Sequence, residues 1–196
     1  EGEEGGSSDK ALPSLPAFDT RITELKDITS EIKEMQNTIS EGWLKIDAKP
    51  IKTVLGKTST QWVDAHTAYL RDYVDNTMSD LQGFISRVQA GLAEEVEEND
   101  SEKLIEAMTY VRDVRLASDR IDGIFEPLKG TIALLKKFGI ATPDETVETL
   151  ENIPFSWENT KKQTYNKREV LGPLQSMQQD RVRQDTDEFR NRVSEF

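Results

Sequence analysis

The sequence predicts an all-α fold: an elongated antiparallel bundle of about four long helices with coiled-coil-like seams and proline kinks. Apolar residues recur in alternating steps of three and four, which is the spacing of one helix face. Charged residues make up 32% of the chain and apolar residues 35%, a balance that suits helices with one buried stripe and a broad solvated face. No useful length of sequence alternates with the period of a strand, and short turns between long helices favour antiparallel neighbours.

The first 16 residues predict a flexible leader, because Gly, Ser, Glu and Pro bury little apolar surface. A first helix is expected from about residue 19 to 41, with Asp19 as its N-cap and Gly42 as its stop. Its apolar positions follow the steps of a coiled-coil seam. They are Ile22, Leu25, Ile28, Ile32, Met35 and Ile39.

The second helix is expected over about 48–97, capped by Asp47 and with Pro50 in its first turn, where a missing N–H is harmless. The polar stretch 75–77 is a candidate bend. The residues expected on its buried stripe are Ile51, Leu55, Trp62, Ala65, Tyr69, Tyr73, Leu81, Ile85, Val88 and Leu92.

The third helix is expected over about 101–138, after a turn at 99–101 and before Gly139. Pro127 lies inside it and should kink it, because proline lacks an N–H and crowds the carbonyl of Gly123. The expected stripe comprises Leu104, Met108, Val111, Val114, Ile121, Phe125, Leu128, Ile132 and Leu135.

The fourth helix is expected over about 143–194 and opens on a capping-box sequence. Thr142 would be the cap, Pro143 the first helical residue, and Glu145 the closing carboxylate. Prolines at 154 and 173 should break or kink this helix. Its stripe is Val147, Leu150, Trp157, Leu171 and Leu174, followed by a sparse set that needs partners outside the chain, namely Val182, Phe189, Val193 and Phe196. Residues 17–196 are thus expected to form one helical bundle.

Charge and composition exclude several classes of function. The net charge is −12, and basic pairs such as Lys136-Lys137 and Lys161-Lys162 are isolated, so no nucleic-acid partner is expected. The chain has no cysteine, which excludes disulfides and thiolate metal sites and favours a reducing compartment. No apolar run approaches the roughly 20 residues of a membrane span, so no membrane partner is expected.

No catalytic, cofactor-binding or metal-binding residue is expected in the chain. Residues 51–58 (IKTVLGKT) end like a P-loop, but the motif needs a glycine where Ile51 stands and a preceding strand. His66 is the single histidine, and Asp64 and Asp72 do not complete a metal site with it.

Three tryptophans are the most informative side chains: Trp43, Trp62 and Trp157. Core packing at helix crossings is the favoured interpretation. The alternative is that they anchor a partner chain, a role in which tryptophan is enriched.

Several segments resemble, in the same order, the tail of dynein heavy chains. They are residues 43–52 (WLKIDAKPIK), 80–85 (DLQGFI), 125–129 (FEPLK), 157–162 (WENTKK) and 173–175 (PLQ). The resemblance covers about residues 40–196 and is strongest to axonemal heavy chains of the outer-arm type.

The resemblance implies a place in the tail, N-terminal to the linker, of a microtubule motor whose ATPase modules lie outside these residues. It implies that the chain is not itself an enzyme and that ATP and Mg belong to the parent's motor domain. The implied partners are sister heavy chains, intermediate and light chains and, indirectly, the doublet microtubule. The implied location is the cytoplasmic cytoskeleton, in the axoneme of a cilium or flagellum.

The implied function is structural: support for assembly of the motor complex and transmission of force between tail and motor domain. A spectrin-like helical spacer or cytoskeletal adaptor, unrelated to a motor, is the alternative that the same heptads allow. Sequence following Phe196 would distinguish them, since a motor continues into P-loops and a spacer into further helical repeats.

Overall fold

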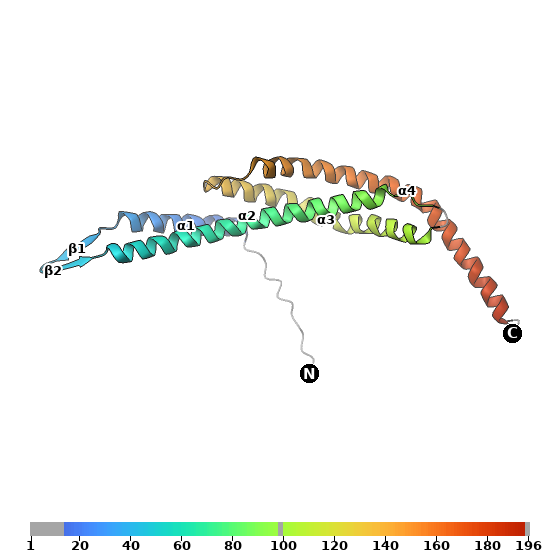
Figure 1. Cartoon of the computed structure of the whole chain (residues 1–196), viewed down its shortest axis with the longest axis horizontal. Helices are drawn as coiled ribbons and strands as arrows, with labels where there is room; N and C mark the ends of the chain where they lie inside the picture. The colour runs from blue at the N-terminus through green and yellow to red at the C-terminus, as the bar shows by residue number, and fades with distance from the viewer. Residues whose placement is uncertain (1–13, 98–99, 195–196) are drawn as a thin grey trace, which may run out of the picture. The chain divides into compact units, whose positions relative to one another are not determined.

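The structure of the chain, a computed structural model, describes residues 14–97 and 100–194. These residues form four helices and one small hairpin, which confirms the all-α bundle class (Figure 1). The predicted leader falls mainly outside the described residues. The elements are α1 (Leu15–Glu34), β1 (Thr38–Glu41), β2 (Leu44–Asp47), α2 (Lys49–Ala93), α3 (Ser101–Lys137) and α4 (Asp144–Ser194).

Helix α1 begins a full turn earlier than the sequence predicts. Its first N–H groups, those of Ala17 and Phe18, donate to the carbonyl of Ser14, so the predicted N-cap at Asp19 is wrong. The earlier start adds Phe18 to the buried face beside Ile22. The Asp19 carboxylate instead accepts hydrogen bonds from Lys137 Nζ at 2.5 and 2.7 Å, which ties α1 to the end of α3.

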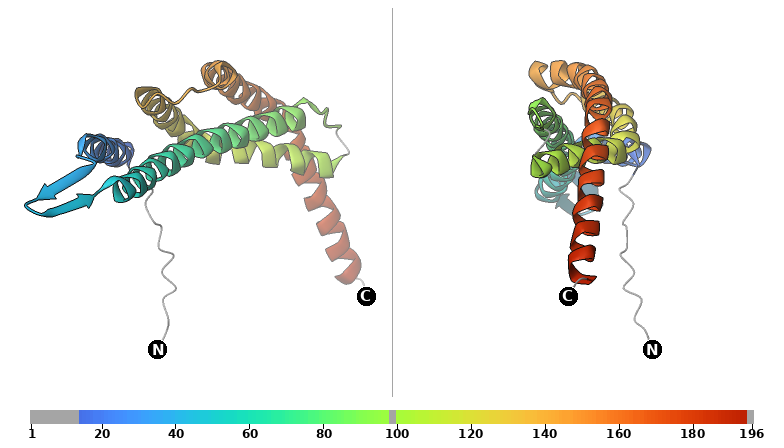
Figure 2. Two further views of the ribbon diagram at one scale, coloured as in Figure 1. Left: turned by 60° about the vertical axis from the view of Figure 1, so that its left-hand side comes forward. Right: turned by 90° about the vertical axis from the view of Figure 1, so that its right-hand side faces the viewer.

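A β-hairpin replaces the predicted end of the first helix. The helix stops at Glu34, and β1 pairs with β2 in antiparallel register, with Ile39 opposite Ile46. Gly42 has a φ of 57° and is the first of two turn residues, a positive φ that glycine adopts readily. Gly42 is therefore a hairpin residue and not a helix stop. Figure 2 shows the hairpin projecting beyond the neighbouring ends of α1 and α2.

Helix α2 is a single element, without a break at the polar stretch 75–77. The backbone N–H of Lys49 donates to Asp47 Oδ1 at 2.9 Å, which confirms the cap predicted for Asp47. The helix ends at Ala93, four residues before the expected boundary. Residues 51–58, the P-loop-like sequence, are helical.

Helix α3 has the boundaries that its caps predict. Asp100 Oδ1 accepts the N–H of Lys103 at 3.0 Å, which is the N-cap interaction. At the other end Gly139 has a φ of 78°, and the N–H of Ile140 donates to the carbonyl of Leu135. The N–H of Gly139 donates to the carbonyl of Lys136, and the two hydrogen bonds together form a Schellman motif. The helix continues through Pro127, where the kink remains a prediction.

Helix α4 also continues through both of its internal prolines, so of the predicted break or kink only a kink is compatible with the structure. Figure 1 shows it changing direction along its length. The capping box is absent too, because the Thr142 hydroxyl is buried and has no hydrogen-bond partner among the described residues. Pro143 supplies the first acceptor carbonyl, for Thr146 and Val147, so the helix begins one residue later than predicted.

The chain divides into two compact units, and α2 and α3 contribute a part to each. Unit 1 comprises residues 1–74 and 127–142, and unit 2 comprises residues 75–126 and 143–196. In unit 1, α1 runs antiparallel to α2, as the hydrogen bonds from Ser59 to Leu25 and from Lys52 to Met35 show. Its core cluster contains Phe18, Ile22, Leu70, Leu134 and Leu135.

Unit 2 has the same up-down-up order of three helices. Gln89 bonds Thr160 and Lys167 bonds the carbonyl of Glu94, so α2 and α4 run in the same direction. Between them in sequence, α3 runs the opposite way. Buried residues of unit 2 include Met78, Leu81, Ile85, Val88, Leu92, Leu104, Ala107, Val114, Ile121, Leu150, Ile153, Trp157 and Leu171.

Candidate interaction surfaces

Trp157 lies at the centre of a polar and aromatic cluster in unit 2. The side chain is fully buried, and its Nε1–H donates to Asp122 Oδ1 at 2.8 Å. Lys161 Nζ donates to both oxygens of the same carboxylate, at 3.1 and 3.2 Å, and pairs with Glu158 at 2.6 Å. The ring of Phe84 lies 6.2 Å from that of Trp157, measured between centroids. The cluster joins α2, α3 and α4, which confirms the core interpretation of this tryptophan.

The Asp122 carboxylate and the Lys161 ammonium are held in their ionised forms. Burial raises the pKa of Asp122, but the hydrogen bonds from Lys161 and Trp157 outweigh burial, and the pKa lies below its ordinary value. Burial lowers the pKa of Lys161, but the hydrogen bonds to Glu158 and Asp122 outweigh burial, and the pKa lies above its ordinary value. A carboxylate that stays ionised beside an ammonium cannot serve as a general acid near neutral pH. The cluster therefore stabilises the helix crossing.

The other two tryptophans lie on the surface of unit 1. Trp43 occupies the hairpin turn and is 95% exposed, and Trp62 on α2 is 57% exposed. Core packing is the wrong interpretation of Trp43, because the sequence around it forms a turn and not a helix crossing. The alternative, an anchor for a partner chain, stays open for both.

An exposed heptad seam follows the first half of α2, and we call it the α2 seam. Its residues are Ile51, Leu55, Thr58, Trp62, Ala65 and Tyr69, in steps of four and three, and all are exposed. The sequence places this stripe inside the bundle, and that placement is wrong for this half of the helix. The residues buried in its place are Ser59, Thr67, Leu70 and Val74.

Small side chains explain why α2 turns this other face toward α1. A methyl group added at Gly56 would lie 3.8 Å from Ile32 Cγ2, so the two helices approach closely there. Ser59 Oγ bonds the Leu25 carbonyl at 3.0 Å and lies 2.7 Å from Thr29 Oγ1. A glycine and a hydroxyl thus favour close contact that the bulky seam residues would prevent.

The α2 seam continues into a hollow beside the hairpin. Its volume is about 320 Å³, and it is lined mainly by apolar side chains. Met35 directly follows α1, Ile39 lies on β1, and Ile51 and Leu55 lie on α2. The exposed apolar surface of unit 1 therefore combines residues from β1, α2 and the segment after α1.

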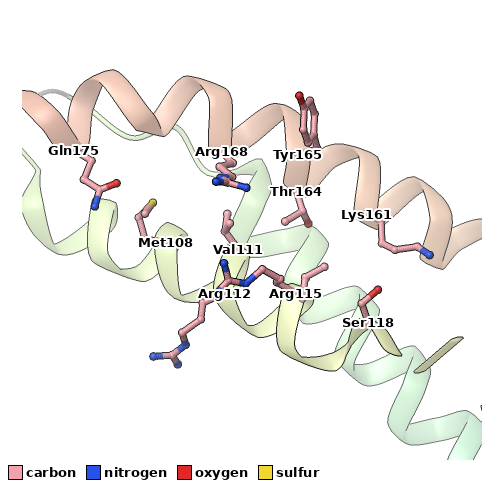
Figure 3. Close-up of a pocket in the computed structure, with 11 residues that line it drawn as sticks. Met108, Val111, Arg112, Arg115, Ser118, Lys161, Thr164, Tyr165, Arg168 and Gln175 are labelled. Carbon is pink, nitrogen blue, oxygen red and sulfur yellow. The ribbon is translucent and has the colours of Figure 1, made fainter. Parts of the chain in front are cut away.

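A second surface lies between α3 and α4 of unit 2, and we call it the basic groove (Figure 3). Met108, Val111 and Val114 of α3 and Thr164 of α4 form its floor. The basic residues that line it are Arg112, Arg115, Lys161 and Arg168. Its volume is about 440 Å³. Sequence reasoning did not find it, because these residues lie on two helices and converge only when the helices pack in register.

The described residues offer no metal site, since none of them form a group of three or more His, Cys, Asp or Glu side chains that would hold an ion. His66 Nδ1 lies 2.7 Å from the carbonyl oxygen of Trp62, and its ring meets that of Phe18 edge-on. Among the residues that the structure describes, no helix has the length and apolar character to cross a membrane.

Comparison with known proteins identifies the relatives of the chain. It is 31% identical over 188 residues to mouse dynein axonemal heavy chain 17, and the match covers 95% of the chain. It is 32% identical to the flagellar outer-arm dynein beta chain of Chlamydomonas reinhardtii and to the ciliary dynein beta chain of Tripneustes gratilla, with 94% of the chain covered in each case. The chain is a homologue of one segment of the axonemal dynein heavy chains.

The homology confirms the dynein resemblance and favours it over a spacer unrelated to a motor. The chain spans only 4 to 5% of the length of these relatives. No family model matches the sequence. The relatives' names are those of axonemal, ciliary and flagellar proteins, which supports the predicted location in the axoneme.

Proposed function

We propose that the chain is a structural segment of an axonemal dynein heavy-chain tail, N-terminal to the linker. It supports assembly of the motor complex and transmits force between the tail and the motor domain. In this proposal the segment is not an enzyme, and ATP and Mg²⁺ act in the parent's motor domain. Its partners are other dynein subunits, namely sister heavy chains and intermediate and light chains, with the doublet microtubule reached indirectly.

The exposed α2 seam is the observation that carries this proposal. Covering a large apolar side chain stabilises an association by about 1.5–3 kcal/mol. Ile51, Leu55 and Trp62 are all more than two-fifths exposed. Their heptad spacing matches the face that a helix presents to another helix in a coiled coil. A helical scaffold that packs against neighbouring chains fits this surface, and catalysis does not require it.

The long helices support the transmission of force. Helix α2 has 45 residues, which gives a length of about 68 Å at 1.5 Å per residue. Helices α2 and α3 each belong to both units. Load that enters either unit therefore passes along hydrogen-bonded helix backbone.

The test is made in the whole heavy chain, in cilia that can be genetically modified. Replacing Ile51, Leu55 and Trp62 together with Gln should prevent normal arm assembly while the ATPase activity of the motor domain is retained. The matched control replaces Lys57, Thr60 and Asp64 with Gln, because these residues are exposed on α2 outside the seam. Arms that assemble and beat normally with the seam variant would contradict the proposal.

A deletion of residues 40–196 tests the same proposal more coarsely. Arm assembly or motility should be disrupted, and the isolated motor domain should keep its ATPase activity. Electron microscopy of the axoneme and a beat-frequency measurement report the two outcomes.

A further inference from the structure

The basic groove of unit 2 continues into a second hollow along the same two helices. The two hollows share Met108, Arg112 and Gln175, and their volumes are about 440 and 830 Å³. On α3 the combined groove extends from Ser101 to Ser118, which corresponds to about 27 Å of helix. A trough of this length has the dimensions of a single helix of about five turns.

The charge of the groove is opposite to that of the chain. Five basic side chains line the two hollows and no acidic one does, although the net charge of the chain is −12. The five are Arg112, Arg115, Lys161, Arg168 and Arg183. The clustering of one sign of charge in a groove attracts a partner of the other sign.

Three of the five basic side chains pair with carboxylates of the chain itself. Lys161 is engaged by Asp122 and Glu158. Arg112 bonds Asp113 at 3.0 Å, and Arg183 lies 3.9 Å from Asp180.

Arg115 and Arg168 have no hydrogen-bond or ion-pair partner among the described residues, and both are exposed. Figure 3 shows them on facing helices, Arg115 on α3 and Arg168 on α4. Two unpaired guanidinium groups on opposite walls suit carboxylates placed on both flanks of an occupant.

The floor and rim of the groove are apolar. Met108, Val111 and Val114 line the floor. Ile105 and Val182 line the second hollow and are 67% and 61% exposed. An occupant must therefore present an apolar stripe toward the floor as well as negative charge toward the walls. A nucleic acid offers the charge without the apolar stripe, so the lining of the groove favours an amphipathic peptide over a nucleic acid.

We propose that the basic groove binds an acidic amphipathic helix of another protein chain, with its apolar stripe on the α3–α4 floor and its carboxylates on Arg115 and Arg168. This inference concerns unit 2 alone. It does not rest on the α2 seam, so either proposal can fail without the other.

The test uses the 196-residue chain and a designed fluorescent peptide of about 18 residues, with leucines at helical i, i+3, i+4 and i+7 positions and glutamates on both flanks. Fluorescence anisotropy should show saturable binding that weakens as salt is added. A peptide with lysines in place of the glutamates should bind at least tenfold more weakly. Absence of saturable binding, or equal affinity for the lysine peptide, would overturn the proposal.

The matched variants test whether binding depends on the charges of the groove or on the net charge of the chain. Arg115→Glu with Arg168→Glu should weaken binding about tenfold or more, because two attractive contacts become repulsive. Arg120→Glu with Lys162→Glu makes the same change of charge on the same two helices outside the groove, and it should change affinity less than about twofold. Circular dichroism verifies that both variants fold. Equal losses in the two variants, or tighter binding of a single-stranded oligonucleotide than of the acidic peptide, would overturn the assignment.

Discussion

Units 1 and 2 share helix α2, but the two halves of the helix bury different kinds of side chain. The half in unit 2 buries the apolar stripe that the sequence predicts, including Leu81, Ile85 and Val88. The half in unit 1 buries Ser59 and Thr67 and leaves its apolar seam exposed. A heptad pattern thus identifies a face that favours contact with another helix, but it does not say whether that helix belongs to the same chain.

The largest contrast between the units should come from their tryptophans. Trp157→Ala should lower the free energy of unfolding by about 3–5 kcal/mol, because it leaves a cavity and Asp122 loses the hydrogen bond that the indole N–H donates. Trp43→Ala should change it by less than about 0.5 kcal/mol, since the side chain is exposed. Urea denaturation followed by circular dichroism measures both. Similar losses in the two variants would show that the burial contrast is wrong.

A glycine pair on α2 tests the packing of unit 2. A methyl group at Gly91 would overlap the ring of Tyr110, so Gly91→Ala should destabilise the chain by about 1–3 kcal/mol. Gly83 has open space around it, and Gly83→Ala should stabilise the chain by up to about 1 kcal/mol through helix propensity. Thermal unfolding reports the opposite signs. A neutral Gly91→Ala variant would mean that α2 and α3 lie farther apart.

The charge cluster of unit 2 predicts a dependence on pH. The pKa of Asp122 is lowered in the folded chain, so its contribution is present above the unfolded pKa and is lost as pH falls through the folded value. Asp122→Asn should cost about 1 kcal/mol at pH 7, since the pair is partly exposed, and less at pH 3. Urea midpoints at both pH values measure the difference. A cost that is unchanged at pH 3 would assign the effect to packing.

A comparably small effect on stability should come from the α2 seam. Trp62→Gln should change the free energy of unfolding by less than about 0.5 kcal/mol, because the side chain already lies mostly in water. Chemical denaturation of the isolated chain measures this. A loss of several kcal/mol would mean that the seam packs within the chain and is not a surface for partners.

Local signals predicted much of the fold. Asp47 caps α2 as expected, Asp100 in the turn expected before α3 caps that helix, and Gly139 ends α3 in a left-handed conformation. The stripe of α3 is buried or half-buried along its whole predicted length. These features depend on residues within a turn or two of each other, which a single sequence displays directly.

The errors arose where tertiary contacts decide the outcome. The hairpin has strands of only four residues, too short to show a period, and Gly42 fits a helix stop as well as a turn. Ser59 and Thr67 are buried because α1 approaches α2 closely, which no pattern within α2 reveals. The basic groove requires the register of α3 on α4. Arg115 and Arg168 are more than fifty positions apart, and their proximity cannot be predicted from one sequence.

The placement of Trp43 at the hairpin turn gives the chain an intrinsic optical reporter. A side chain that is 95% in water is open to a soluble quencher such as iodide, whereas Trp157 is enclosed on all sides. Trp62 is 57% exposed and is open to the quencher as well, so quenching would separate the emission of the two surface tryptophans of unit 1 from that of the core without any label. When a neighbouring chain covers the hairpin or the α2 seam, the accessible fraction of the fluorescence should fall, so docking on unit 1 can be followed in real time.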